Sequence, residues 1–149
     1  MIEYRKANIS DIQYLVQYRK QQLIDEGEIF GKEIDDELSE YFISSISDNS
    51  LISWLAVDGE RIVATSGICF YQLPPTSRNP SGKNAYITNM YTLPEYRKQG
   101  IGSQLLQLVI DEAKILKYKV IRLHASDDGK SIYNKAGFND TNGYMALRL

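Results

Sequence analysis

A glycine turn beside two basic residues is the part of the sequence best equipped for chemistry. Residues 96–103 read Tyr-Arg-Lys-Gln-Gly-Ile-Gly-Ser. Residues 85–93 before the turn are rich in aromatic and β-branched side chains, and this predicts a strand that ends at Pro94. Apolar residues then recur at helical spacing over residues 101–116. Because the first N–H groups of a helix lack intrahelical partners and carry the positive end of its dipole, the turn predicts a phosphate site.

The spacing of the glycines separates three kinds of phosphate-binding loop. A dinucleotide fingerprint needs a third glycine where Leu105 stands. Residues 129–131 supply the Gly-Lys-Ser ending of a P-loop, but His124 occupies the place of its first glycine. The turn does fit R-x-x-G-x-G, from Arg97 to Gly102. In this it resembles the acetyl-CoA pyrophosphate loop of the GCN5-related N-acetyltransferase (GNAT) family.

A second segment carries the same resemblance. Residues 131–138 read Ser-Ile-Tyr-Asn-Lys-Ala-Gly-Phe and are similar to the family's Tyr-x-x-x-Gly-Phe segment. The resemblance covers essentially the whole chain and implies transfer of an acetyl group from acetyl-CoA to a primary amine, directly within a ternary complex. It implies that Tyr133 is the general acid. A phenol with an ordinary pKa of about 10 is protonated at neutral pH and can donate to the departing sulfur.

The resemblance also implies the residues that contact acetyl-CoA. Backbone groups of residues 90–92 would hold the pantetheine arm, and residues 97–103 would bind the pyrophosphate. Ser126 stands where many relatives have asparagine, and Gly129 where many have alanine. The expected acetyl-CoA contacts are Met90, Tyr91, Thr92, Arg97, Lys98, Gln99, Gly100, Ile101, Gly102, Ser103, Ser126 and Lys130.

The group that removes the proton from the amine stays open. Some relatives carry a glutamate where this chain has Tyr86, and residues 85–93 contain no carboxylate. The proton can leave through ordered water, through Glu28 or Glu33, or before the amine binds. Two rival functions also stay open: a non-catalytic acyl-CoA-binding or sensing protein on the same fold, and a nucleotide-binding protein that uses the Gly-Lys-Ser sequence.

Length and composition predict a small, soluble intracellular protein. The 149 residues are 43% hydrophobic, which suits one domain over residues 1–149. A net charge of −2 gives no general attraction to nucleic acid, and no apolar stretch is long enough for a membrane span. One cysteine excludes an intrachain disulfide, and with one histidine the sequence has no metal-site pattern. We expect a cytoplasmic protein whose acceptor is a small-molecule amine or a peptide amine; a homodimer through the C-terminal strands is implied by the resemblance.

The periodicities predict an α+β fold, with a mixed central sheet flanked by helices in the order βααβββαβαβ. A capping box formed by Ser10 and Gln13 predicts the start of the first helix, and Gly27 its end. Asp58-Gly59 predicts a hairpin turn. The predicted strands are 2–7, 51–57, 61–71, 85–93, 120–125 and 144–149, the other helices are 32–47, 101–116 and 130–136, and the loop 74–84 is a candidate substrate flap.

Overall fold

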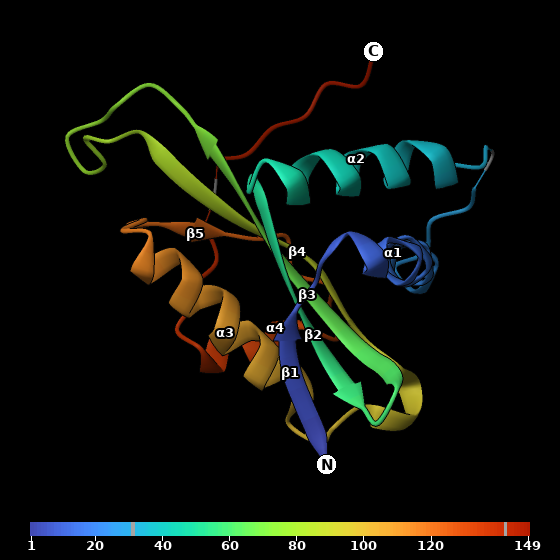
Figure 1. Cartoon of the computed structure of the whole chain (residues 1–149). Coiled ribbons are helices and arrows are strands. Elements are labelled where there is room, and N and C mark those ends of the chain that lie inside the picture. Colours follow the sequence, from blue (N-terminus) through green and yellow to red (C-terminus); the bar gives the residue numbers. More distant parts are fainter. Residues whose placement is uncertain (31, 142) are drawn as a thin grey trace.

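A five-stranded sheet forms the centre of the computed structural model, which describes residues 1–30, 32–141 and 143–149 (Figure 1). The strands follow the order β1-β2-β3-β4-β5, and all neighbours are antiparallel except β4 and β5, which are parallel. The α+β class and the mixed sheet are therefore confirmed. The strands are β1 (Ile2–Lys6), β2 (Leu51–Asp58), β3 (Arg61–Gln72), β4 (Lys83–Thr92) and β5 (Ile121–Arg122).

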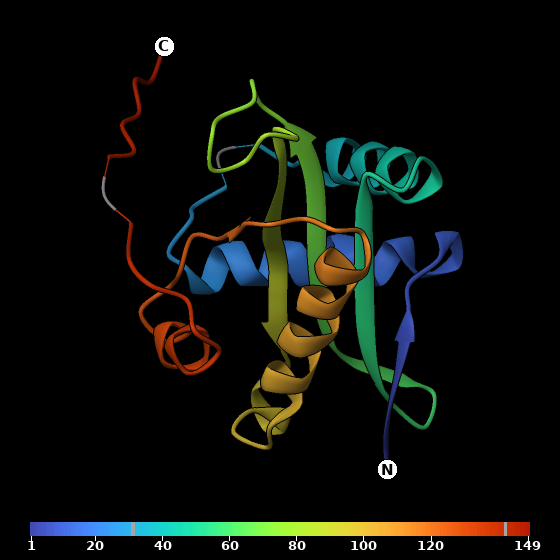
Figure 2. The same cartoon turned by 90° about the vertical axis from the view of Figure 1, so that its left-hand side faces the viewer.

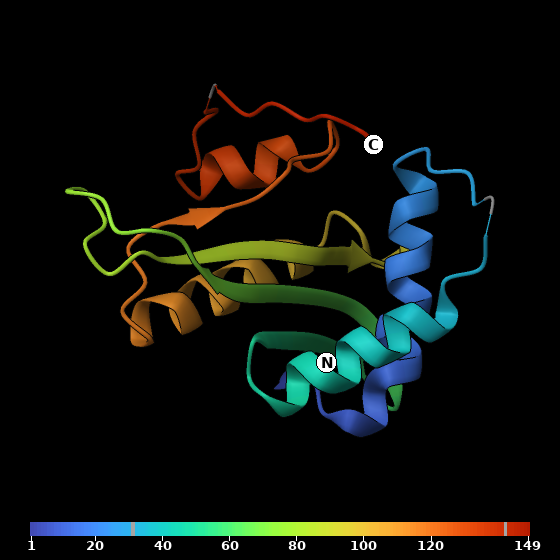
Figure 3. The same cartoon turned by 90° about the horizontal axis from the view of Figure 1, so that it is seen from above.

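Helices cover both faces of this sheet. Figures 2 and 3 show α1 (Ile12–Asp25) and α2 (Asp35–Ser47) on one face and α3 (Ile101–Ile115) on the other, while α4 (Lys130–Lys135) follows β5. The alternation of side chains along the strands divides the core accordingly. Leu15, Phe42, Leu51 and Leu55 pack on the α1 side, and a second cluster around Ile68, Ala85, Ile87, Leu106 and Val109 packs under α3.

A bulge in β4 interrupts its pairing with β3. Between Thr65 and Gly67 of β3, two steps along β3 match three steps along β4, so β4 carries one extra residue. Asn89 lies there with a positive φ of 55°. On its other side β4 pairs with β5 only at Ala85 and Tyr86. Among the described residues, the second half of β4 therefore has a free edge where an extended ligand can add.

The start of the first helix differs from the prediction. Asn8, not Ser10, is the cap: its side chain accepts from the Ser10 N–H at 2.8 Å. Asp11, not Gln13, completes the capping box by accepting from the Asn8 N–H at 2.9 Å. Arg5 of β1 holds the Asp11 carboxylate with two bonds of 2.8 Å and lowers its pKa. Because Arg5 binds Asp11, the capping box begins at Asn8, two residues before the predicted Ser10.

The predicted closing strand over residues 144–149 is wrong. These residues form no strand, and the segment extends away from the body of the molecule (Figures 1 and 2). The strand predicted over 120–125 is also shorter, because only Ile121 and Arg122 have a partner in β4. Strand-forming residues still need a neighbour to pair with. In the described part of the chain, neither segment finds one along its whole length.

In the described ranges, no helix is long and apolar enough to cross a membrane.

Candidate functional site

The turn after β4 forms an anion-binding nest. Lys98 and Gly100 have left-handed backbones, with φ of 59° and 82°, and Gly100 is the N-cap of α3 without any side-chain cap. The N–H groups of residues 98–103 bond to no acceptor within the described ranges. Such a run of free N–H groups at a helix start suits a phosphate. The turn therefore offers free N–H groups of the kind that bind phosphate, and its contact with pyrophosphate stays a prediction.

The second predicted motif lies beside this turn. A Cβ added to Gly102 would lie 3.6 Å from Ile132 Cδ1 and 4.0 Å from Thr92 Oγ1. Gly102 thus brings the start of α3 close to both α4 and the end of β4. Ile132 directly precedes Tyr133 in α4. The glycine turn, the free edge of β4 and the helix carrying Tyr133 meet at one place.

Arg97 points its charge at α1. Its Nη2 lies 3.0 Å from Asp25 Oδ2, its Nε donates to the Thr92 carbonyl at 2.9 Å, and its guanidinium carbon lies 5.6 Å from the centre of the Tyr91 ring. The side chain therefore ties the C-terminal end of α1 to the end of β4. The expected contact of Arg97 with pyrophosphate stays a prediction. Lys130, the other predicted phosphate contact on a helix, pairs with Asp140 at 3.1 Å.

Tyr133 is held in a packed position. Its ring meets Phe138 edge-on, with centres 6.1 Å apart. A Cβ on Gly129 would lie 3.0 Å from Tyr133 Cε2 and 3.2 Å from Ser126 Oγ, so the Tyr133 ring packs tightly against Gly129. Burial first, then the charges of Glu26 and Tyr86, raise the pKa of Tyr133 to about 12. The phenol is thus protonated at neutral pH, as a proton donor must be.

Ser126 forms a hydrogen bond with the backbone of the segment that leads into α4. Its Oγ accepts from the Gly129 N–H at 3.2 Å, just ahead of α4. Asp127 and Asp128 form no side-chain cap there. Contacts of Ser126 with pantetheine stay a prediction.

Tyr86 and Glu26 complete the surroundings of Tyr133. Burial raises the pKa of Tyr86. Glu26 is the C-cap of α1. The sequence analysis missed Glu26 and named Glu28 and Glu33 instead; Glu33 forms an ion pair with Lys20 at 2.7 Å. The signal that could have drawn attention to Glu26 is its place in the sequence, directly before Gly27 at the predicted end of the first helix.

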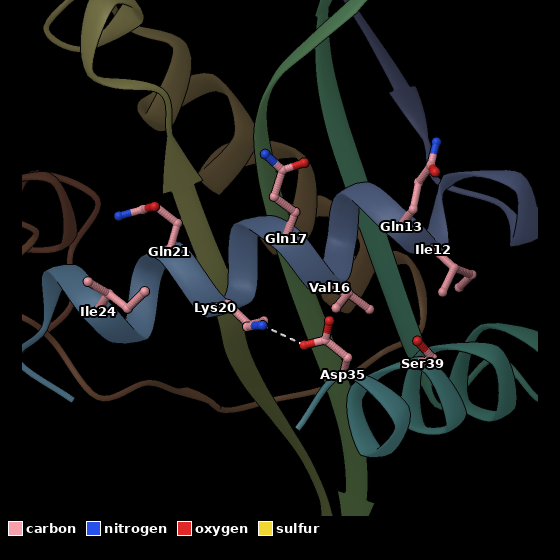
Figure 4. A pocket seen from close by; sticks show the side chains of 9 residues that line it. All are labelled: Ile12, Gln13, Val16, Gln17, Lys20, Gln21, Ile24, Asp35 and Ser39. Atoms are coloured by element: carbon pink, nitrogen blue, oxygen red, sulfur yellow. Dashed lines mark hydrogen bonds and ion pairs between the residues drawn. The ribbon is translucent and has the colours of Figure 1, made fainter. Parts of the chain in front are cut away.

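One groove lies away from these residues. It has a volume of about 550 Å³ and opens between α1 and α2, on the side of α1 away from the sheet (Figure 4). Lys20 within it is neutralised by Glu33 and Asp35, and these partners raise its pKa. It holds none of the predicted contacts. The loop predicted as a flap lies at the opposite end of β4 from the glycine turn (Figure 1), which does not support a role over the reacting groups.

Metal chemistry has no visible support in the part of the chain that the structure describes. No group of three or more histidine, cysteine, aspartate or glutamate side chains is placed to hold an ion there.

Comparison with known proteins gives a family match. The model of the acetyltransferase (GNAT) family matches residues 16–138. A predicted acetyltransferase from Clostridium acetobutylicum, solved with acetyl-CoA, is 43% identical and superimposes with a TM-score of 0.96 over 99% of this chain and 96% of its own. A GCN5-related N-acetyltransferase from Ralstonia eutropha JMP134 is 22% identical, with a TM-score of 0.89 over 99% of each chain.

Two relatives with more specific names are more distant. Glucosamine-6-phosphate N-acetyltransferase from Arabidopsis thaliana shares the fold at 20% identity, with a TM-score of 0.77 over 99% of this chain and 98% of its own. Thialysine N-epsilon-acetyltransferase from Mus musculus is 28% identical over 75 residues, which are 46% of this chain. That match spans only 44% of the mouse enzyme's length.

Proposed function

The chain belongs to the acetyltransferase (GNAT) family, and from this membership we propose that it moves an acetyl group from acetyl-CoA to a primary amine, directly within a ternary complex. One observation carries the proposal. The free N–H groups of residues 98–103 directly follow the free edge of β4, and Gly102 among them lies close both to Thr92 at the end of β4 and to Ile132, the neighbour of Tyr133. An extended thioester with a pyrophosphate at one end suits this arrangement.

Each part of the site has a role in the proposal. The turn binds the pyrophosphate, and the edge of β4 binds the pantetheine as an added strand would. A main-chain N–H of Met90 or Tyr91 donates to the thioester oxygen as negative charge develops on it. Tyr133 protonates the departing sulfur. The residues assigned to acetyl-CoA are Met90, Tyr91, Thr92, Arg97, Lys98, Gln99, Gly100, Ile101, Gly102, Ser103, Ser126 and Lys130.

The acceptor we propose is a small-molecule amine first and a peptide amine second. The Arabidopsis and mouse relatives are both named for small amines, which supports this order. A suitable amine panel contains thialysine, glucosamine 6-phosphate, spermidine and a lysine peptide with a free N-terminus. Thiol release from acetyl-CoA measures turnover with each. We keep the cytoplasmic location, and the absence of nucleic-acid and membrane partners, as predictions.

Thermal unfolding with added ligands tests the acetyl-CoA site. A ligand at a hundred times its dissociation constant stabilises the folded state by about 2.7 kcal/mol, so acetyl-CoA and CoA should each raise Tm by several degrees while ATP and NAD do not. A rise with ATP alone would favour nucleotide binding, and no rise with any ligand would remove the acetyl-CoA site. Binding of acetyl-CoA without thiol release from any panel amine would instead favour the non-catalytic sensor.

We also propose that the chain forms a homodimer through its C-terminal segment. Met145, Leu147 and Leu149 share one face of an extended strand and are 97%, 85% and 116% exposed in the single chain. Segment 123–125 after β5 also lacks a strand partner among the described residues. Pairing of the two segments between copies would bury the apolar face and extend β5.

Sedimentation tests the dimer. We expect a dimer at micromolar concentration for the unaltered chain and a monomer for Leu147→Asp. Arg148→Asp is the matched control, because it puts the same side chain on the opposite face and should leave the dimer intact. A monomeric unaltered chain would refute the proposal.

A further inference from the structure

We propose that Glu26 binds the ammonium group of the acceptor amine and takes its proton, a role that rests on the proposed acetyl transfer. Glu26 is the first residue after α1, and the helix dipole places partial negative charge at this end. The free N–H groups of residues 98–103 give the opposite polarity to the pyrophosphate turn. A cationic acceptor would thus approach the partly negative end of α1, and the anionic pyrophosphate would approach the partly positive start of α3.

Glu26 is fixed in place by its neighbours. Asp25, the residue before it, is held by Arg97 at 3.0 Å and by Gln21 Nε2 at 2.9 Å. The Glu26 N–H donates to the Gln22 carbonyl at 3.0 Å. Arg97 in turn is anchored to the Thr92 carbonyl. The end of α1, and Glu26 with it, is therefore joined to Thr92 at the end of β4, next to the residues assigned to the thioester oxygen.

Glu26 lies near enough to the proton donor for its charge to act on it. Figures 2 and 3 show α4 and the C-terminal end of α1 on the same side of β4. The Glu26 charge is close enough to raise the pKa of Tyr133, after the larger effect of burial. Only Glu26 Oε1 is engaged, by Gln22 Nε2 at 3.2 Å, and within the described ranges no cation pairs with the carboxylate. One carboxylate oxygen is available to a substrate.

The competing acids are less suitable. Glu33 is neutralised by Lys20 at 2.7 Å. Glu28 follows the turn that ends α1, where its N–H bonds to the Leu23 carbonyl, and its charge is not among those that shift the pKa of Tyr133. Tyr86 occupies the strand position of the glutamate in some relatives, but burial raises the pKa of its phenol, so it is protonated at neutral pH and cannot accept a proton.

The two residues together account for every proton. The ammonium N–H bond breaks, and its proton goes to the Glu26 carboxylate and from there to water. The nitrogen lone pair then forms the bond to the carbonyl carbon, the C–S bond breaks, and Tyr133 protonates the thiolate. The nitrogen is now positively charged and loses a second proton to the Glu26 carboxylate, and this proton returns through water to the Tyr133 phenolate. The products are the amide, CoA and one proton released to water, and both residues recover their starting states.

Glu26→Gln tests this role, with Glu28→Gln as the matched control. We expect kcat/KM for the preferred panel amine to fall about 10²-fold at pH 7 in Glu26→Gln, with acetyl-CoA affinity unchanged, because a neutral amide cannot take the proton. The loss should shrink towards pH 10, where the amine itself is deprotonated. The variant leaves the other charged or titratable groups near Glu26 unaltered. These are Tyr133, Tyr86 and the Asp25–Arg97 pair. Glu28→Gln should match the unaltered chain.

A binding experiment separates this role from turnover. Each panel amine is titrated calorimetrically into the protein saturated with CoA, and Glu26→Gln should weaken the observed binding at least tenfold. Equal amine affinity, or no binding of any panel amine to the unaltered chain, would overturn the role of Glu26. If the unaltered chain turns over an amine and Glu26→Gln matches it at every pH, acetyl transfer stands and the Glu26 proposal fails. If the unaltered chain binds an amine but releases no thiol, acetyl transfer fails, while weaker binding to Glu26→Gln still supports the ammonium contact.

Discussion

Phenylalanine in place of Tyr133 is expected to lower turnover about 10²-fold and to leave acetyl-CoA affinity within about twofold. The change removes only the hydroxyl, so the edge contact with Phe138 and the packing against Gly129 remain. The departing thiolate then has to take its proton from water. Thiol release at saturating substrate measures the loss, and calorimetry with acetyl-CoA measures the unchanged affinity.

Tyr4→Phe is the control for this prediction. Tyr4 lies on β1, at the far edge of the sheet from α4, and loses the same atom. It should leave both measurements unchanged. Because burial raises the pKa of Tyr133 to about 12, its phenol remains protonated and turnover of the unaltered chain should not fall between about pH 8 and pH 10. Undiminished turnover in Tyr133→Phe would exclude the acid role.

Elements with strong local signals were predicted well. Asp58-Gly59 marked the hairpin between β2 and β3, and Gly59 has the positive φ of 62° that such a turn needs. The apolar spacing after residue 101 predicted α3 to within one residue of its end. In both cases the residues that determine the structure are close together in the sequence, so tertiary contacts were not needed to find them.

The wrong predictions concern segments whose structure depends on contacts with residues far away in the sequence. The composition of residues 144–149 favours a strand, yet it carries no information on whether an edge is available to pair with. Two capping boxes are possible before the first helix, Asn8 with Asp11 and Ser10 with Gln13. Arg5 on β1 binds the Asp11 carboxylate and so favours the first. Both outcomes depend on contacts between elements rather than on local preference.

The candidate site divides in the same way. The glycine turn and the segment around Tyr133 are short motifs, so the sequence alone could identify them. The ion pair between Arg97 and Asp25 joins residues 72 positions apart, and no local pattern announces it. The place of Glu26 at the end of α1 depends on that junction. Sequence reasoning therefore identified the two short motifs and left the choice among the acids near the end of α1 open.

Aspartate in place of Ser103 is expected to weaken acetyl-CoA binding about 10²-fold without destabilising the fold. Ser103 is exposed in the first turn of α3, where a carboxylate interacts favourably with the helix dipole and should hold or slightly raise Tm. The same negative charge would stand beside the bound pyrophosphate. Repulsion between charges a few ångströms apart near a protein surface is worth a few kcal/mol, and a hundredfold change in Kd corresponds to about 2.7 kcal/mol. Calorimetry and thermal unfolding measure the two effects separately.

Ser103→Asn isolates the charge, because asparagine has the shape of aspartate and no charge. It should bind acetyl-CoA within several-fold of the unaltered chain. The difference in Kd between the two variants should shrink as salt is added, since ions screen exposed charges. Equal affinities of the two variants for acetyl-CoA at low salt would mean that the pyrophosphate lies away from the start of α3. Stability and binding are expected to move in opposite directions in Ser103→Asp, because the helix dipole that attracts the pyrophosphate attracts the new carboxylate as well.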